Sequence, residues 1–285
     1  MPDCRNANFE HRAVLAPADD AGCESTGVWA ADHGTTCCMS TLYSEPERHE
    51  YLDHSIRDAH HRLIVGSILR DFEIRRGACV VEIGAGAGRY TSLLLEHGLT
   101  VVAIEPDPAL AEKLRARHGA HARIRTVIAY PYDVASFPPD TVAVCGFHVL
   151  HHMDTAALAQ LGAVLRQLRD SRAGFRGWFF LEPNPYNPLY PLQIALRRSM
   201  HFREEKGIWM NRYERALGDG RAATMGFVGY WPPGRMIASA PAGVQRLGTR
   251  AVRHVSPLRA YMIVGQMYGA RGGEPSQDDA VAGGG

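Results

Sequence analysis

The sequence predicts an α/β protein in which a parallel sheet is covered by helices on both faces. Short apolar runs alternate with helix-compatible segments from residue 78 onward, a pattern typical of parallel strands joined by crossover helices. A glycine-rich turn between the first apolar run and the next helix indicates a ligand site at the end of that strand. Strands are expected at Ala78–Ile83, Val101–Ile104, Ile124–Ile128, Val142–Gly146 and Trp178–Leu181.

Helices are expected between these strands. Glu45–Phe72, ahead of the first strand, repeats apolar residues at helical spacing, and Pro46 suits its first turn. Asp154 is the expected N-cap of the last helix, because its carboxylate can accept hydrogen bonds from free backbone N–H groups. The helices that follow the first strands are expected at Tyr90–His97, Ala109–His118 and Thr155–Arg169.

Composition narrows the class of protein. With 46% hydrophobic residues, the 285-residue chain can bury a large core, and its net charge of +1 gives no overall attraction to nucleic acid or acidic membranes. No run of 18 apolar residues is present, and charged residues interrupt the N-terminus, so we expect neither a spanning helix nor a signal peptide. The six cysteines match no common zinc spacing. We expect free thiols, no metal and a cytoplasmic location.

The most informative stretch is the turn after the first strand. Val80–Arg89 reads Val-Val-Glu-Ile-Gly-Ala-Gly-Ala-Gly-Arg, so an acid ends a buried strand and glycines follow at alternate positions. Glycine is needed where the backbone takes positive φ or touches a ligand. Glu105 ends the next apolar run, about 20 residues on, where nucleotide-binding folds place a carboxylate on ribose hydroxyls.

The glycine spacing separates two cofactor classes. A dinucleotide loop reads G-x-G-x-x-G, but here Arg89 stands where that motif has its third glycine, and Gly88 is the third glycine instead. The resulting E-x-G-x-G-x-G resembles the first motif of class I methyltransferases, which bind S-adenosylmethionine. The sequence therefore favours a methyltransferase over a dehydrogenase.

The resemblance covers roughly residues 45–268 and includes three further motifs in the family's order. Asp133–Asp140 resembles the acidic turn before the fourth strand, Phe147–Met153 resembles the segment after it, and Glu182–Pro185 resembles the turn after the fifth strand of small-molecule methyltransferases. The resemblance implies a Rossmann-like, seven-stranded, mostly parallel sheet whose last strand is antiparallel. Ala222–Tyr230 and Ala260–Met267 are then strands six and seven.

The resemblance also implies a cofactor site. Glu105 would accept the ribose hydroxyls, Asp133 would contact the adenine amino group, and Glu82 would orient the loop or meet the cofactor amino group through water. Structural alternatives are a solvated acid at a strand end, a structural cap and an ordinary turn aspartate. The expected cofactor-binding residues are Glu82, Gly84, Ala85, Gly86, Gly88, Glu105, Pro106, Asp133, Val134 and Phe147.

Three histidines follow the fourth strand, where the family's active site opens. His148 and His151 are candidate general bases, because histidine takes up a proton near neutral pH, and His152 is a candidate substrate contact. In the alternative interpretation, His151 and His152 pack at a helix entrance. A base is dispensable if placement of the acceptor supplies the acceleration.

Residues 183–221 interrupt the strand–helix alternation. They carry six Arg and one Lys against three Glu and one Asp, a net charge of +3. We interpret this insert as a substrate lid for an anionic or lipid-like molecule, and a helix packed on the sheet edge is the alternative. Its candidate substrate contacts are Tyr186, Tyr190, Arg197, Trp209 and Tyr213.

The sequence thus predicts a loosely ordered arm at 1–44, a methyltransferase domain at 45–268 and a disordered tail at 269–285. The expected reaction is methyl transfer from S-adenosylmethionine to an O, N or C atom of a small molecule in specialised metabolism. Alternatives are a peptide or nucleic-acid methyltransferase and a cofactor-binding regulator or pericyclic-type catalyst. Asn184-Pro-Tyr186 matches the motif of amino-methylating DNA enzymes poorly, and nucleic acid is not expected as partner. The oligomeric state is left open.

Overall fold

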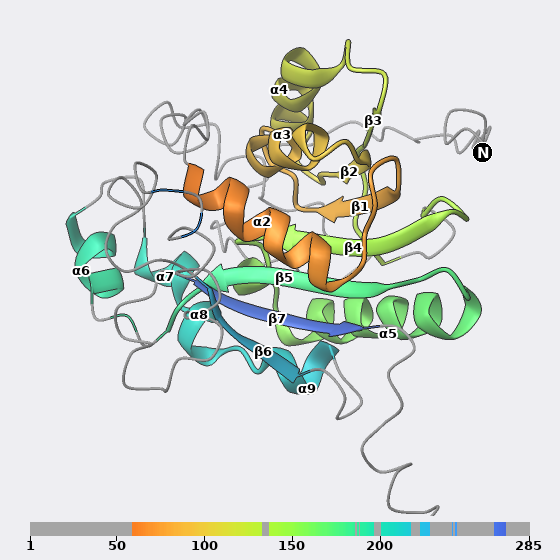
Figure 1. Ribbon diagram of the computed structural model, residues 1–285. Helices are drawn as coiled ribbons and strands as arrows, with labels where there is room; N and C mark the ends of the chain where they lie inside the picture. The colour runs from red at the N-terminus through yellow and green to blue at the C-terminus, as the bar shows by residue number, and fades with distance from the viewer. Residues whose placement is uncertain are drawn as a thin grey trace, which may run out of the picture.

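The fold is a seven-stranded sheet between two layers of helices (Figure 1). A computed structural model describes residues 59–132, 137–185, 187, 189–196, 201–217, 223–228, 241, 243 and 265–271. The strands are β1 (Cys79–Ile83), β2 (Thr100–Ile104), β3 (Ile124–Val127), β4 (Thr141–Phe147), β5 (Gly177–Pro183), β6 (Ala223–Val228) and β7 (Gly265–Arg271).

The strand order is β3-β2-β1-β4-β5-β7-β6. Strands β1 to β5 pair in parallel, whereas β7 pairs antiparallel with both β5 and β6. The predicted mostly parallel sheet with an antiparallel last strand is therefore confirmed. The order of strands switches at β1, because β2 and β3 follow on one side of it and β4 and β5 on the other. Ligands of open α/β sheets bind beyond the carboxyl ends of the strands at such a switch point.

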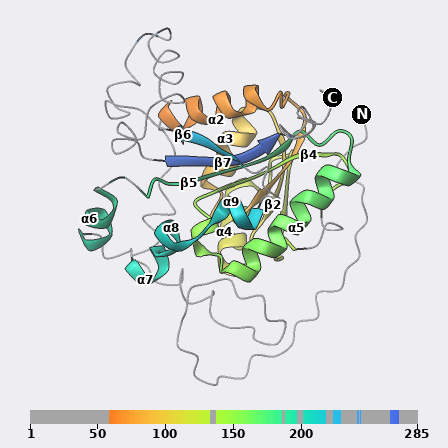
Figure 2. The ribbon, with the colours of Figure 1, turned by 90° about the horizontal axis from the view of Figure 1, so that it is seen from below.

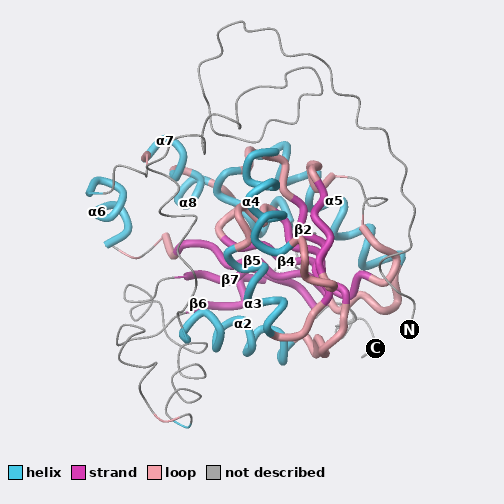
Figure 3. The backbone as a smooth tube through the Cα atoms, turned by 90° about the horizontal axis from the view of Figure 1, so that it is seen from above, coloured by secondary structure: helices cyan, strands magenta, loops and turns pink. Residues whose placement is uncertain are grey.

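The helices are α2 (Ala59–Asp71), α3 (Arg89–Glu96), α4 (Pro108–His118), α5 (Thr155–Ser171), α6 (Leu189–Leu196), α7 (Phe202–Glu205), α8 (Gly207–Met210) and α9 (Tyr213–Leu217), with a 3-10 turn, η2 (Leu150–His152). Figures 2 and 3 show α2 and α3 on one face of the sheet and α5 on the other. Asp154 caps α5 as predicted, because its carboxylate accepts a 2.7 Å hydrogen bond from the N–H of Ala157.

Each face of the sheet has its own hydrophobic core. Every residue of β1 is buried, as expected of a central parallel strand covered on both sides. Val80 points into the core beneath α2 and α3, and Val81 points into the core beneath α5. The alternation along β1 thus fixes which face each residue serves, and Glu82 returns to the α3 face.

Two predicted boundaries differ from the structure. Strand β7 extends to Arg271, three residues into the predicted tail, because its backbone pairs with β5 as far as Gly177. The seventh strand was expected to end at residue 267, whereas the observed strand continues to Arg271. The arm at 1–44, the beginning of the predicted helix at 45–72 and the remaining tail lie outside the described residues.

The described residues of the insert form four short helices, α6 to α9. Helices α6, α7 and α8 lie beyond the end to which the β5 arrow points in Figure 1, so the insert stands at the carboxyl edge of the sheet. Helix α9 returns to pack on α5, where Leu217 enters the core of that face. The described part of the insert therefore reaches both the carboxyl edge of the sheet and the α5 layer.

Candidate functional site

The glycine loop joins β1 to α3 through three residues of positive φ. Gly84, Gly86 and Gly88 have φ of 65°, 56° and 84°, a left-handed conformation that only glycine adopts without strain. The N–H of Gly84 donates to the carbonyl of Ile104 at 2.9 Å, which ties the loop to the end of β2. The predicted loop residues, with buried Ala85, lie together at the carboxyl edge.

Gly86 and Gly88 serve different purposes. A Cβ at Gly86 would meet no atom of the described chain within 4 Å, so the space above it is open. A Cβ at Gly88 would come within 2.6 Å of Leu114 and 2.8 Å of His118, both in α4. The glycine at 88 is therefore required by helix packing as well as by its φ, whereas the glycine at 86 leaves room for a ligand.

Glu105 lies directly beside this open space. Its carboxylate accepts hydrogen bonds from the N–H of Gly86 at 2.8 Å and from the N–H of Asp107 at 3.0 Å. The residue is only 3% exposed, and burial raises the pKa of its carboxyl to about 7. Each carboxylate oxygen keeps a further lone pair, so the group can accept additional hydroxyl hydrogen bonds. Pro106 follows, half-buried.

Glu82 acts on the first turn of α3. The hydroxyl of Thr91 donates to Glu82 at 2.6 Å, and the carboxyl is 1% exposed. Burial raises the pKa of Glu82 to about 8. The contact joins β1 to α3 across the loop, which agrees with the expected orienting role.

Aromatic side chains line the end of β4. The ring of Phe147 stacks on Tyr90 with centroids 4.2 Å apart, and the Tyr90 hydroxyl is 3.1 Å from Nε2 of His148. His148 has φ of 56°, unusual for a residue with a side chain. Burial lowers the pKa of His148 to about 3, so its imidazole is neutral near pH 7. The candidate base is thus held against Tyr90 in a strained backbone.

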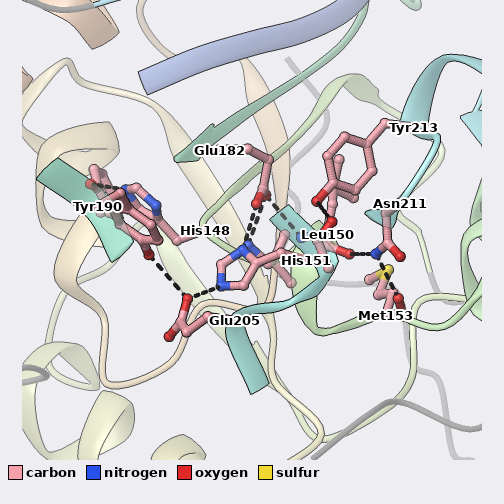
Figure 4. A network of polar contacts seen from close by, with 12 residues as sticks. His148, Leu150, His151, Met153, Glu182, Tyr190, Glu205, Asn211 and Tyr213 are labelled. Atoms are coloured by element: carbon pink, nitrogen blue, oxygen red, sulfur yellow. Dashed lines mark hydrogen bonds and ion pairs between the residues drawn. The ribbon is translucent and has the colours of Figure 1, made fainter. Parts of the chain in front are cut away.

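His151 occupies a different environment, shown in Figure 4. Its Nδ1 lies 2.6 Å from Glu182 of β5, and its Nε2 lies 3.4 Å from Glu205 of α7. The residue is 5% exposed, and burial lowers its pKa to about 3. Both ring nitrogens face carboxylates of the protein. This geometry opposes the expected role of His151 as a general base and favours its alternative as a packed structural residue.

The insert supplies the remaining described candidates. The Tyr190 hydroxyl donates to Glu205 at 3.0 Å, and the indole N–H of Trp209 donates to the carbonyl of Pro185 at 3.0 Å. The Tyr213 hydroxyl donates to the carbonyl of Gly207, and this side chain belongs to the core beneath α5. Tyr213 therefore packs inside the protein and is not at an acceptor surface, contrary to expectation.

Five other predicted positions need separate mention. The ring of His152 is half-buried and lies against that of His151, with centroids 3.9 Å apart. Asp133, Val134, Tyr186 and Arg197 lie outside the described residues, so their expected roles stay predictions.

Sequence reasoning missed several residues that organise the site. Glu182 was expected only as part of a family-like turn and not as a site residue, although it follows the apolar run of β5 as Glu105 follows that of β2. Tyr90, Glu205 and the other partners carry no comparable signal in the sequence, because their roles depend on contacts between distant segments. The missed residues are Tyr90, Thr91, Glu182, Glu205 and Asn211.

The described residues lack a metal-binding cluster and a membrane-spanning helix. Over these parts of the chain, no cluster of three His, Cys, Asp or Glu side chains is arranged to hold a metal ion. No helix among them has the length and hydropathy needed to cross a bilayer. Cys79 and Cys145 are buried, and neither is joined in a disulfide.

Comparison with known proteins identifies the domain. Residues 81–172 match the family model described as "Methyltransferase domain". An uncharacterized methyltransferase of Geobacillus thermodenitrificans is 32% identical over 104 residues, covering 36% of this chain and 47% of that protein. The mitochondrial ribosomal RNA small subunit methyltransferase of Arabidopsis thaliana is 45% identical over 58 residues, covering 20% of this chain and 15% of that protein.

A solved structure of a SAM-dependent methyltransferase from Archaeoglobus fulgidus aligns with 74% of this chain and 94% of its own, at 16% identity and a TM-score of 0.42. The chain spans less than half the length of the two curated relatives named above. The family match, together with the curated relatives, confirms the predicted resemblance to the class I methyltransferase family over this part of the chain.

Proposed function

We propose that the protein transfers a methyl group from S-adenosylmethionine to an O, N or C nucleophile of a small molecule. The observation that carries this proposal is the open space above Gly86, directly beside the Glu105 carboxylate. The match of residues 81–172 to a methyltransferase domain supports the choice of cofactor, which when bound supplies an activated methyl group on a sulfonium.

The residues present fit such a cofactor. The backbone of Gly84 to Gly86 would hold its amino-acid portion, and Glu105 would accept its ribose hydroxyls with its remaining lone pairs. Phe147 and Tyr90 form an apolar wall at the end of β4. A pyrophosphate would instead need a third glycine at position 89, where the chain has Arg.

His148 would contact the methyl acceptor rather than act as a strong base. Its imidazole is neutral near pH 7, and a pKa of about 3 makes it a weak proton acceptor. Within the described part of the chain, Nδ1 of His148 has no hydrogen-bond partner. Nδ1 can therefore form a hydrogen bond with the methyl acceptor. In-line placement of that molecule against the methyl group then supplies the acceleration.

The insert supports an anionic or lipid-like acceptor. Arg203, Lys206 and Arg212 are exposed near the carboxyl edge, and Phe202 and Met210 expose apolar surface beside them. Basic and apolar side chains together suit an amphipathic acid better than a neutral sugar.

Calorimetry on the full chain tests the cofactor assignment. S-adenosylhomocysteine should bind with one site per chain, and NAD should not bind. Transfer of label from methyl-labelled S-adenosylmethionine should then be compared across three acceptor pools: small amphipathic acids, a peptide library and ribosomal RNA. Binding of NAD alone would refute the cofactor assignment, and label only in RNA or peptide would refute the small-molecule assignment.

A further inference from the structure

The insert contacts the turn that follows His148 at three points. The side-chain amide of Asn211 donates to the carbonyls of Leu150 at 3.2 Å and Met153 at 3.0 Å. Gly207 lies against the carbonyl of His151 so closely that a Cβ there would collide with it. Glu205 reaches Nε2 of the same histidine at 3.4 Å. Residues 201–213 therefore dock on η2 through both backbone and side chains.

The sheet holds the same turn from the other side. One oxygen of Glu182 accepts from the N–H groups of Val149 and Leu150, each at 2.9 Å, and its second oxygen faces Nδ1 of His151 at 2.6 Å. The N–H of His148 donates to the carbonyl of Leu181 at 2.8 Å. The strained backbone of His148 is thus fixed by the end of β5.

His151 is the side chain common to both attachments (Figure 4). We propose that His151 is a positioning residue, which couples docking of the insert through Glu205 to the conformation of His148 through Glu182. The inference rests on the proposed function in one respect, namely that His148 faces the methyl acceptor. Insert docking then orders the acceptor site, and His151 takes no part in proton transfer.

The number of protons on the His151 ring indicates which of its contacts, with Glu182 or with Glu205, is the weaker one. A neutral imidazole has a single N–H, and the shorter contact assigns it to Nδ1, which donates to Glu182. With the ring neutral, the Nε2 contact with Glu205 is a hydrogen bond only when the Glu205 carboxyl holds a proton. The 3.4 Å contact between Nε2 of His151 and Glu205 is therefore the weaker of the two. The hydrogen bond from the Tyr190 hydroxyl holds Glu205 to α6.

Hydrogen exchange on the full chain tests this coupling without cofactor or acceptor. Glu205→Ala removes the contact with His151. It should raise amide exchange at least about tenfold in peptides covering 201–217 and 148–153, with exchange in α5 unchanged. Glu205→Gln should retain slow exchange, because an amide nitrogen in the place of Oε2 can donate one N–H to neutral Nε2 of His151 and the other to the hydroxyl oxygen of Tyr190. His151→Asn can still donate a hydrogen bond to Glu182 but has no atom in the place of Nε2, so its exchange pattern should resemble that of Glu205→Ala. Glu204→Ala is the matched control from the same helix.

Two results would overturn the proposal. Unchanged exchange at 148–153 in Glu205→Ala would show that docking does not reach the His148 turn. Equal acceleration in α5 would show that Glu205 merely stabilises the whole domain. Once an acceptor is known, Glu205→Ala should raise its KM about tenfold or more with cofactor affinity unchanged. If the exchange pattern holds and no methyl transfer is found, the coupling stands and the proposed function fails.

Discussion

Replacing Gly86 by alanine, with Gly77→Ala as the control, distinguishes the loss of space for a ligand from the backbone strain that a side chain causes at positive φ. Gly86 has φ of +56°, Gly77 has φ of +82°, and a Cβ at either would meet no atom of the described chain within 4 Å. Both alanines should therefore lose a similar amount of stability, about 1–2 kcal/mol for a left-handed residue with a side chain. In a domain of this size the melting temperature should fall by about 2–4 °C per kcal/mol.

Only Gly86→Ala should lose cofactor affinity. Gly77 precedes β1 at the amino end of the strand, far from the carboxyl edge, whereas Gly86 lies beside Glu105. A methyl group in that space should weaken S-adenosylhomocysteine binding at least about tenfold, or about 1.4 kcal/mol, and Gly86→Val should abolish it. Calorimetry and thermal melting of the three variants give both quantities. Normal binding by Gly86→Ala with the melting temperature of Gly77→Ala would refute the loop placement.

The remaining predictions concern the buried acids and His148. Glu105→Ala should weaken S-adenosylhomocysteine binding by about 1–3 kcal/mol, because a charged acceptor of hydrogen bonds is lost; unchanged affinity by calorimetry would remove Glu105 from the site. In the native protein that affinity should fall as pH drops through about 7, where the Glu105 carboxyl gains a proton, and Glu105→Gln should flatten the profile. Burial raises the pKa of Glu82 from 4.5 to about 8, so the folded state retains a proton that the unfolded state releases, and stability is lost as pH rises through this window. Thermal melts should therefore show Glu82→Gln gaining stability over the native chain as pH rises to about 8, and a pH-independent difference would contradict the assignment. The imidazole of His148 should show no titration by NMR between about pH 5 and pH 8; a midpoint near its ordinary value would restore it as a strong base.

Local signals predicted the parts of the site that lie close together in the sequence. The acid before the glycine loop, the three positive-φ glycines and the acid ending β2 are all set by backbone turns and strand ends. The Asp154 cap was predictable for the same reason, since its partner N–H is three residues away. Such features need only neighbours along the chain.

Contacts between distant segments were not predictable in this way. The packing requirement at Gly88 comes from Leu114 and His118 of α4, and nothing near Gly88 in the sequence indicates it. Tyr213 was expected at the acceptor surface, yet its ring completes the core beneath α5 because α9 folds back onto that layer. An aromatic residue in a basic insert suits either position until the path of the insert is known.

By itself, the sequence determined the α/β class and the glycine loop after the first strand, because periodicity and turn chemistry act over a few residues. Family resemblance implied the mostly parallel sheet with its antiparallel last strand. Only the tertiary structure decided the roles of the histidines. His148 and His151 are three residues apart, yet one lies against Tyr90 in a strained turn and the other between two carboxylates. The difference arises from β5 and α7, which are distant from this turn in the sequence and contact it only in the folded protein.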